Sequence, residues 1–287
     1  MNGERHRTQR RLMQPPFLKP EMAGYAPIMA RLIDQVLDEW YPVKPLDMYR
    51  EISMLIRASD SQEAGMTERD LIAHAVILYA ASFETTANVL AWTLFLIAQH
   101  PDIAAELHDE IATVPRDWPL DIRQLEVLPL LEAVIYEAMR LMPPLAYTFR
   151  TVTQNVELGG LSLRDGDKVI LSHFLTHRDP DVFPNPNRFD PKRWFTRQPD
   201  SYQYIPFSGG ARLCLGYSFA MLELKLTVLR VMQRFRLAVM PGSVIDRMNQ
   251  LTLRPRMGIP MVVHPQDRAF SAASVSGTIR RMIDLPN

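Results

Sequence analysis

The longest apolar segment of the chain places the strongest constraint on its fold. From Thr67 a helical pattern continues without glycine or proline until His100-Pro101, which predicts a rod of about 50 Å at about 1.5 Å per residue. A helix of that length crosses an entire domain. Polar residues from His74 to Asn88 interrupt the apolar run, so we expect a buried helix and no membrane span.

The rest of the sequence predicts more helices and a small antiparallel sheet. Helical patterns run through 25–40 and 128–141 and from Leu215 onward, where apolar residues recur at spacings of three and four. Residues 155–172 alternate apolar and polar side chains around Gly-Gly and Asp-Gly turns, which is typical of short strands. We therefore expect a mainly α fold with a small antiparallel β region, followed by a flexible tail over 267–287.

Charge and cysteine content narrow the class of protein. Lys+Arg and Asp+Glu both total 32, which argues against a general nucleic-acid binder because such a protein neutralises phosphates. One cysteine cannot form an internal disulfide, and no signal peptide opens the chain. A cytoplasmic protein is the expectation.

The only cysteine, Cys214, lies in the segment FSGGARLCLG at residues 207–216, directly before a helical pattern. The positive end of the helix dipole and the nearby Arg212 favour a thiolate there, and the glycines let a large flat group approach the backbone. An inert buried cysteine, a catalytic nucleophile and a zinc ligand are the alternatives. The sequence offers neither a nearby histidine base nor cysteines at zinc-site spacing, so a thiolate ligand to haem iron fits best.

This segment resembles the haem-binding signature F-x-x-G-x-R-x-C-x-G of the cytochrome P-450 family. Two further motifs resemble the family in the same order: Glu137-Ala-Met-Arg140 is similar to its E-x-x-R, and Arg193 in FDPKRW to the arginine that completes a buried triad. One carboxylate held by two guanidinium groups would fix the cysteine loop, whereas an ordinary surface pair is the alternative for Glu137 and Arg140. The resemblance runs from about Gly3 to about Pro265 and implies a cytochrome P-450-like haem domain over 1–266.

The resemblance also implies the cofactor, haem b, and the residues around it. Cys214 is the implied iron ligand, and Arg10, Arg150 and Arg212 are implied to pair with the haem propionates. His6 stands where the family often has tryptophan, and its imidazole can still donate to a propionate. The other implied contacts to the haem and its ligand are Phe207, Gly210 and Gly216.

On the long helix, AASFETTA resembles the family's oxygen-binding motif A/G-G-x-D/E-T-T and implies catalytic roles for Glu84 and Thr85. The Thr85 hydroxyl can bond back to the carbonyl of Ala81 and bend the helix, opening a groove for oxygen. Glu84 would then supply protons from solvent. A satisfied polar pair in a buried helix is the alternative, and Ser82 replaces the glycine usual in the family.

The resemblance implies a soluble, bacterial-type monooxygenase that inserts one oxygen atom of O₂ into a lipophilic small molecule. Electrons from NAD(P)H would arrive through a ferredoxin or flavodoxin-type donor, steered by the basic residues that open the chain. The family is usually longer, and we expect an N-terminal sheet and two helices over the distal pocket to be missing. The alternative is a shortened haem-binding protein without productive turnover. Implied substrate contacts are Phe83, Leu145, Ala146, Tyr147, Thr148 and residues 251–253.

Overall fold

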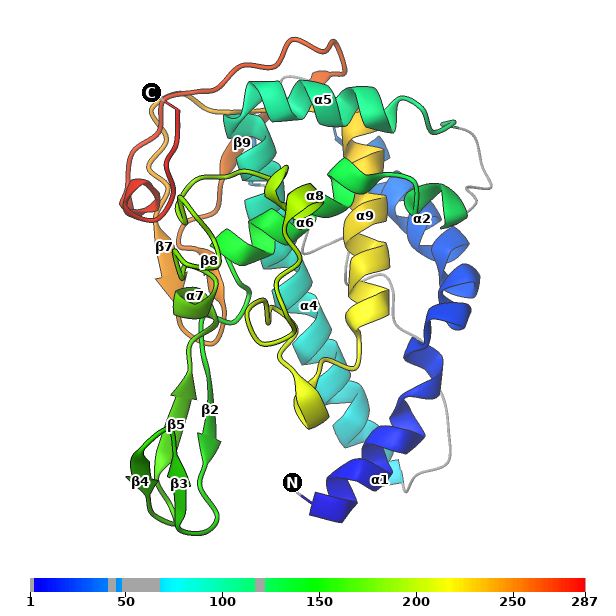
Figure 1. Ribbon diagram of the computed structural model, residues 1–287. Coiled ribbons are helices and arrows are strands. Elements are labelled where there is room, and N and C mark those ends of the chain that lie inside the picture. The colour runs from blue at the N-terminus through cyan, green and yellow to red at the C-terminus, as the bar shows by residue number, and fades with distance from the viewer. Residues whose placement is uncertain (1–2, 41–44, 48–67, 117–121, 287) are drawn as a thin grey trace.

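The computed structural model describes residues 3–40, 45–47, 68–116 and 122–286, and helices dominate it (Figure 1). Short 3-10 turns join several of the helices. The turns are η1 (Pro15–Phe17), η2 (Lys19–Glu21), η3 (Ile122–Leu125), η4 (Gly210–Arg212) and η5 (Thr278–Arg281). The helices are α1 (Gly3–Met13), α2 (Met22–Asp38), α4 (Glu68–Gln99), α5 (Pro101–Ile111), α6 (Pro129–Leu141), α7 (His173–Thr176), α8 (Arg193–Thr196) and α9 (Tyr217–Arg234).

The named strands of the described chain pair antiparallel, as the sequence predicts. A three-stranded sheet has the order β1-β9-β6, and the other strands form two-stranded hairpins or ribbons: β2 with β5, β3 with β4, and β7 with β8. The β2–β5 and β3–β4 pairs project from the helical body (Figure 1). The bounds are β1 (Pro45–Asp47), β2 (Thr148–Thr151), β3 (Val156–Leu158), β4 (Leu161–Leu163), β5 (Lys168–Leu171), β6 (Phe235–Val239), β7 (Arg247–Asn249), β8 (Leu253–Pro255) and β9 (Pro260–Pro265).

Helix α4 is the predicted rod. It spans 32 residues from Glu68 to Gln99, and Pro101 opens α5 directly after the break at His100. Proline suits the first turn of a helix because that turn needs no backbone donor from it. The predicted long helix and its end are confirmed, while Thr67 and the segment predicted to lack the two distal helices lie outside the described residues.

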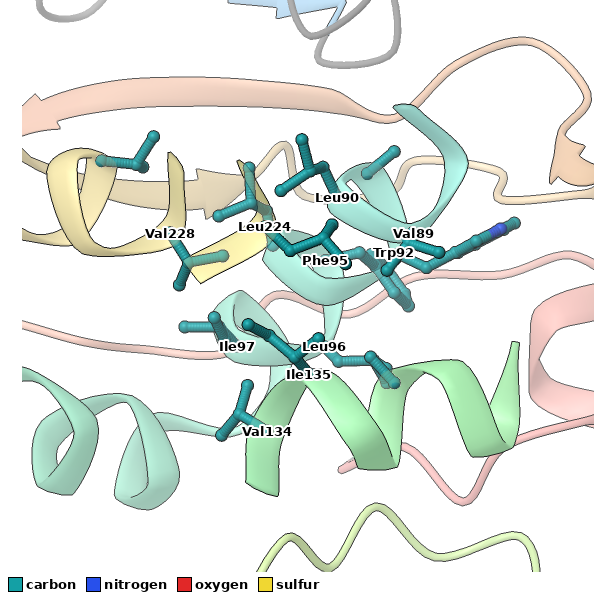
Figure 2. Packing of buried hydrophobic residues seen from close by; sticks show 14 of the residues in the cluster. Val89, Leu90, Trp92, Phe95, Leu96, Ile97, Val134, Ile135, Leu224 and Val228 are labelled. Carbon is teal, nitrogen blue, oxygen red and sulfur yellow. The ribbon is translucent and has the colours of Figure 1, made fainter. Parts of the chain in front are cut away.

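The core forms where α4, α6 and α9 pack together. Residues 86–99 of α4 are all buried, and each large apolar side chain removed from water contributes about 1.5–3 kcal/mol before the entropy cost of folding. Side chains from the three helices interdigitate in Figure 2. Those labelled there are Val89, Leu90, Trp92, Phe95, Leu96 and Ile97 from α4, Val134 and Ile135 from α6, and Leu224 and Val228 from α9.

The same stretch of α4 is the one candidate for a membrane span in the described part of the chain. Residues Ala81–Gln99 are long and apolar enough to cross a bilayer, yet 72% of that window is buried inside the fold. Core helices commonly meet a test of length and composition alone. The burial therefore agrees with the predicted core helix.

The segment after Gln266 differs from the flexible tail expected over 267–287. Through residue 286 it packs on the fold, and Val275, Ile279 and Ile283 are buried in the core. Its backbone is also fixed, because the Asp284 N–H donates to the carbonyl of Asn187 at 3.0 Å. The sequence-based expectation was wrong because these apolar residues, although separated by polar ones, turn toward a common surface.

Candidate functional site

The cysteine lies on a tightly hydrogen-bonded loop. The Cys214 N–H donates to the carbonyl of Phe207 at 2.8 Å, and the Leu213 N–H donates to that of Gly210 at 3.1 Å. Gly210 has a φ of 59°, in the left-handed region where a side chain is strained. The loop ends at Gly216, the N-cap of α9. The backbone of Cys214 is therefore fixed while its side chain stays exposed.

The thiol of Cys214 does not have the shift toward thiolate that the sequence predicted. Although Cys214 is an exposed residue, the protein atoms around its sulfur desolvate the charged form and raise the pKa of Cys214, while the Gly216 N–H and the charge of Arg10 lower it by less. The backbone donor at the helix start thus acts in the expected direction, but the guanidinium that lowers the pKa of Cys214 is that of Arg10, whereas the sequence pointed to Arg212. The prediction was wrong because desolvation of the charged form outweighs both of them.

Basic side chains from the first helix reach the cysteine loop. Nη1 of Arg10 donates to the carbonyl of Leu213 at 2.7 Å. Desolvation, followed by the charges of Arg212 and Arg10, lowers the pKa of His6, so His6 stays neutral at pH 7 and keeps one ring N–H to donate. The structure therefore brings His6, Arg10 and Arg212 together at the loop.

Arg150 takes a different position. It lies exposed on β2, where Nη1 donates to the carbonyl of Phe149 at 3.0 Å. Its charge contributes, after burial, to lowering the pKa of His173. No described contact joins Arg150 to the cysteine loop, so its predicted role at the propionates stays a prediction.

Glu137 lies at the centre of a buried network on α6. Its carboxylate is fully buried and accepts from Nε and Nη2 of Arg140 at 2.8 and 2.9 Å. Nε of Arg193 donates to Oε1 of the same carboxylate at 3.0 Å. The structure thus joins the three residues that the sequence grouped, and excludes the exposed i, i+3 pair as an account of Glu137 and Arg140.

The same carboxylate has partners that the sequence analysis missed. Nε1 of Trp194 donates to Oε2 at 3.1 Å, and the Asp190 N–H donates to Oε1 at 3.0 Å. Nη1 of Arg140 donates to the carbonyls of His177 and Pro186 at 2.9 and 2.7 Å. The donors to Glu137 approach both oxygens and hold the buried carboxylate in one orientation. The dense run of Pro, Asp, Asn and Arg over 178–200 was the one signal that an ordered loop is present there.

His177 is another residue of this network that the sequence did not indicate. Its Nε2 accepts the N–H of Ile205 at 2.9 Å, so the neutral ring carries its proton on Nδ1. Burial, followed by the charge of His173 and of nearby arginines, lowers the pKa of His177 to about 3. Because its carbonyl accepts from Arg140, His177 connects the Glu137 network to the segment that leads into the cysteine loop.

On α4 the structure contains the hydrogen bond expected of Thr85. Its Oγ1 donates to the carbonyl of Ala81 at 2.6 Å. The helix nevertheless continues unbroken to Gln99. The hydrogen bond from Thr85 therefore does not interrupt α4. Ala81 and Ser82 are exposed and Phe83, Glu84 and Thr85 are half-buried, whereas everything from Thr86 to Gln99 is buried. Residues 81–85 of α4 therefore remain partly accessible to solvent among the described residues.

Glu84 does not contact Thr85 through a described hydrogen bond. Its Oε1 accepts from Oγ1 of Thr252 at 2.6 Å and lies 3.9 Å from Nε of Arg254. Both partners come from the far end of the chain, on and beside β8. No local sequence pattern indicates this contact.

The predicted substrate residues lie along the extended segment after α6. Ala146 is buried and its carbonyl accepts the N–H of Phe174 at 3.0 Å. Oγ1 of Thr148 lies 3.3 Å from Nε2 of His173, Tyr147 is exposed and Leu145 is half-buried. The segment is thus anchored at two points and leaves Tyr147 accessible, while Phe83 packs partly against the core.

The described residues do not form a metal site made of protein side chains alone. Among the described residues, no three His, Cys, Asp or Glu side chains form a group that could hold a metal ion. Zinc needs four ligands in a structural site and usually three protein ligands in a catalytic one. A single exposed thiol beside cationic side chains suits a cofactor that brings its remaining ligands with it, as haem does.

Comparisons with known proteins point to the same cofactor. The family model described as Cytochrome P450 matches residues 44–261. Cyclooctatin synthase from Streptomyces melanosporofaciens is 34% identical over 227 residues, which are 78% of this chain and 50% of that protein. Cytochrome P450 3A29 from Sus scrofa is 31% identical over 232 residues, 77% of this chain and 46% of that protein.

Solved structures agree on the fold. The structure titled Retinoic acid bound cyanobacterial CYP120A1 superposes with a TM-score of 0.80 at 22% identity, covering 92% of this chain and 80% of that chain. The cytochrome P450DA heme domain superposes with a TM-score of 0.78 at 21% identity, covering 93% and 78%. The chain spans about half the length of the curated relatives described above.

Proposed function

Because the chain belongs to the cytochrome P450 family, as the match over residues 44–261 shows, we propose that it is a haem-thiolate monooxygenase. It inserts one oxygen atom of O₂ into a lipophilic small molecule. One observation carries the proposal furthest: the only cysteine is exposed at the start of α9, on a loop held by its own backbone and by Arg10. The cytoplasm is the proposed location.

Cys214 holds the iron of haem b as a thiolate. The loop itself raises the pKa of this thiol, so coordination to the metal has to remove the proton, as it does for coordinating thiols generally. His6, Arg10 and Arg212 bind the propionates, since they gather at the loop and carry donors for carboxylates. Arg150 is a further propionate ligand in this proposal. Gly210 and Gly216 leave the loop backbone open to the porphyrin, and Phe207 shields the sulfur.

When bound, haem would supply the redox chemistry by which O₂ is activated with two electrons and two protons. The protein supplies the position and the protons. The Glu137 network holds the loop that carries Cys214, through Arg140, His177 and the Ile205 N–H. A thiolate in a fixed place is what an iron ligand requires.

Thr85 and Glu84 carry the protons. The Thr85 hydroxyl donates its one hydrogen bond to the Ala81 carbonyl. Its oxygen therefore keeps lone pairs that can accept a further hydrogen bond. Glu84 is partly exposed and exchanges protons with water. Proton transfer by positioned groups contributes about 10²–10⁴-fold to rates of this kind.

The electrons come from NAD(P)H through a ferredoxin or flavodoxin-type donor. On α1, Arg7 and Arg11 are exposed, while Arg10 is engaged with Leu213. Two exposed guanidinium groups on the helix whose Arg10 contacts the cysteine loop would steer an acidic donor toward that side of the protein. The residues proposed to contact the substrate are Phe83, Leu145, Ala146, Tyr147 and Thr148.

A second candidate follows from the length of the chain relative to its relatives. A shortened haem-binding protein without productive turnover would share the site but lack a complete substrate pocket. Both candidates bind haem, so the test is product formation. The haem-loaded chain is supplied with a surrogate ferredoxin system and a panel of lipophilic compounds: oxygenated product supports the monooxygenase, and reductant consumption without product supports the second candidate.

A further inference from the structure

One face of α4 is hydrogen-bonded to the β7–β8 hairpin. Glu84, Asn88 and Trp92 follow one another at a spacing of four, so they line a single face of the helix. Nε1 of Trp92 donates to the carbonyl of Leu253 at 3.0 Å. Both other side chains contact Thr252. The hairpin is thereby tied to α4 at three successive turns.

Thr252 is the central member of a directed chain of hydrogen bonds. Its Oγ1 accepts from Nδ2 of Asn88 at 3.0 Å and donates to Oε1 of Glu84 at 2.6 Å. A hydroxyl has one proton, so once Asn88 donates to the oxygen the proton is directed to the carboxylate. Thr252 and Asn88 are buried, at 3% and 0% exposure, and water is therefore a poor substitute for either partner.

Both described contacts of the Glu84 carboxylate come from the hairpin. The Thr252 hydroxyl and Nε of Arg254, at 3.9 Å, face the same oxygen, Oε1. Thr85, the next residue along α4, instead bonds back to Ala81. The acid and the alcohol are thus adjacent in sequence but are held by different parts of the fold.

We propose that Thr252 is a positioning residue for Glu84: the β7–β8 hairpin sets the orientation of this carboxylate beside Thr85. Of the contacts that the described residues make with the Glu84 carboxylate, removing the Thr252 hydroxyl leaves the longer one to Arg254. The carboxylate then samples other orientations, and proton delivery next to Thr85 loses its fixed geometry. Only this catalytic consequence rests on the proposed function; the orientation itself is a property of the fold.

The test compares variants of the haem-loaded full chain labelled with ¹³C at glutamate side-chain carboxyls. The infrared band that disappears in Glu84→Gln identifies the Glu84 carboxylate. We expect this band to shift in Thr252→Val, which removes the hydroxyl at nearly constant shape, and to stay in place in Thr252→Ser. Thr93→Val is the matched control, because Thr93 is a buried threonine of α4 whose hydroxyl donates to Val89. Thr252→Ala replaces Thr252→Val should the latter fold poorly.

The second measurement is hydrogen peroxide released per reductant consumed. Loss of one hydrogen bond of ordinary strength changes an equilibrium between orientations about fivefold, so peroxide release should rise by about that factor in Thr252→Val. It should not rise further when Thr252→Val is added to Glu84→Gln, since the carboxylate is already absent. An unmoved band in Thr252→Val overturns the proposal, and so does an equal rise with and without Glu84. A parent chain that yields no product counts against the proposed function alone, because the infrared comparison still reports the orientation.

Discussion

Arg140 binds both oxygens of the Glu137 carboxylate, with Nε 2.8 Å from Oε2 and Nη2 2.9 Å from Oε1, and both side chains are fully buried. A two-pronged contact of this kind fixes the plane of the guanidinium. The remaining nitrogen, Nη1, is thereby aimed at the carbonyls of His177 and Pro186. One side-chain pair thus fixes the backbone of the segment that precedes the cysteine loop.

Glu137→Ala should destabilise the protein and abolish stable haem uptake. Removing one partner of a buried ion pair costs about 3–5 kcal/mol because the other charge is left uncompensated, and here two arginines lose their partner. Urea unfolding and haem content measure the loss. Glu106→Ala is the matched control: its pair with Lys192 has the same 2.8 Å distance but is about half exposed, and should cost no more than about 1 kcal/mol. Equal effects of the two substitutions would contradict the buried network.

The Cys214 thiol should react slowly with alkylating reagents near neutral pH. Burial raises its pKa above the ordinary value of 9.0, and only the thiolate reacts. In the haem-free chain, the rate of iodoacetamide labelling should therefore still be rising above pH 9, and haem binding should block labelling. Cys214→Ser supplies the blank, as the chain has no second cysteine. A rate that levels off below pH 8 would show that the loop favours the thiolate.

Iron ligation by Cys214 is tested in the haem-loaded chain. We expect reduced protein under CO to show the red-shifted Soret band that is typical of a thiolate ligand. Cys214→His should remove this band, because imidazole donates less electron density than thiolate. A histidine-type band in freshly prepared parent protein would assign the iron to another ligand.

Thr85→Ala should divert electrons from product to hydrogen peroxide. The hydroxyl that bonds to Ala81 is lost, and with it a positioned group on the proton route, so product per reductant should fall about tenfold. Thr85→Ser keeps the hydroxyl and is the control. An unchanged ratio in Thr85→Ala would remove this residue from the proton route.

His177 should make the protein less stable in acid. Its pKa is 6.5 when unfolded and about 3 when folded, so between these values the unfolded state binds a proton that the folded state does not. Stability therefore falls as the pH drops from 6.5 toward 3, by up to about 1.4 kcal/mol per pH unit for this group. Urea unfolding at pH 7, 6 and 5 should show a shallower decline in His177→Asn than in the parent. Parallel declines would mean that His177 is protonated in the folded protein.

A substitution at Ile283 tests whether the segment after Gln266 packs on the fold. This side chain is 1% exposed, and truncating a buried isoleucine to alanine costs about 2–5 kcal/mol. Ile283→Ala should therefore lower the free energy of unfolding by that amount. Met257→Ala, at a residue that is 82% exposed, should change it by less than about 0.5 kcal/mol. Similar small effects at both positions would favour the flexible tail.

The sequence by itself determined the features that depend on near neighbours. The break between α4 and α5 follows from Pro101, and the hydrogen bond from Thr85 to Ala81 follows from the four-residue spacing of a helix. The same geometry places Glu137 and Arg140 on one face of α6. The motif around Cys214 indicated the cofactor, because a lone thiol among glycines and arginine suits few other chemistries.

Only the tertiary structure decided what depends on segments far apart in the chain. Thr252 is 168 residues from Glu84, and no local pattern relates a hairpin residue to a helical carboxylate. His177 and Trp194 join the Glu137 network through contacts that exist only after the loop over 178–200 has folded onto α6. The pKa of Cys214 was misjudged for the same reason: helix position and a nearby charge can be seen in the sequence, but desolvation depends on every atom packed around the sulfur.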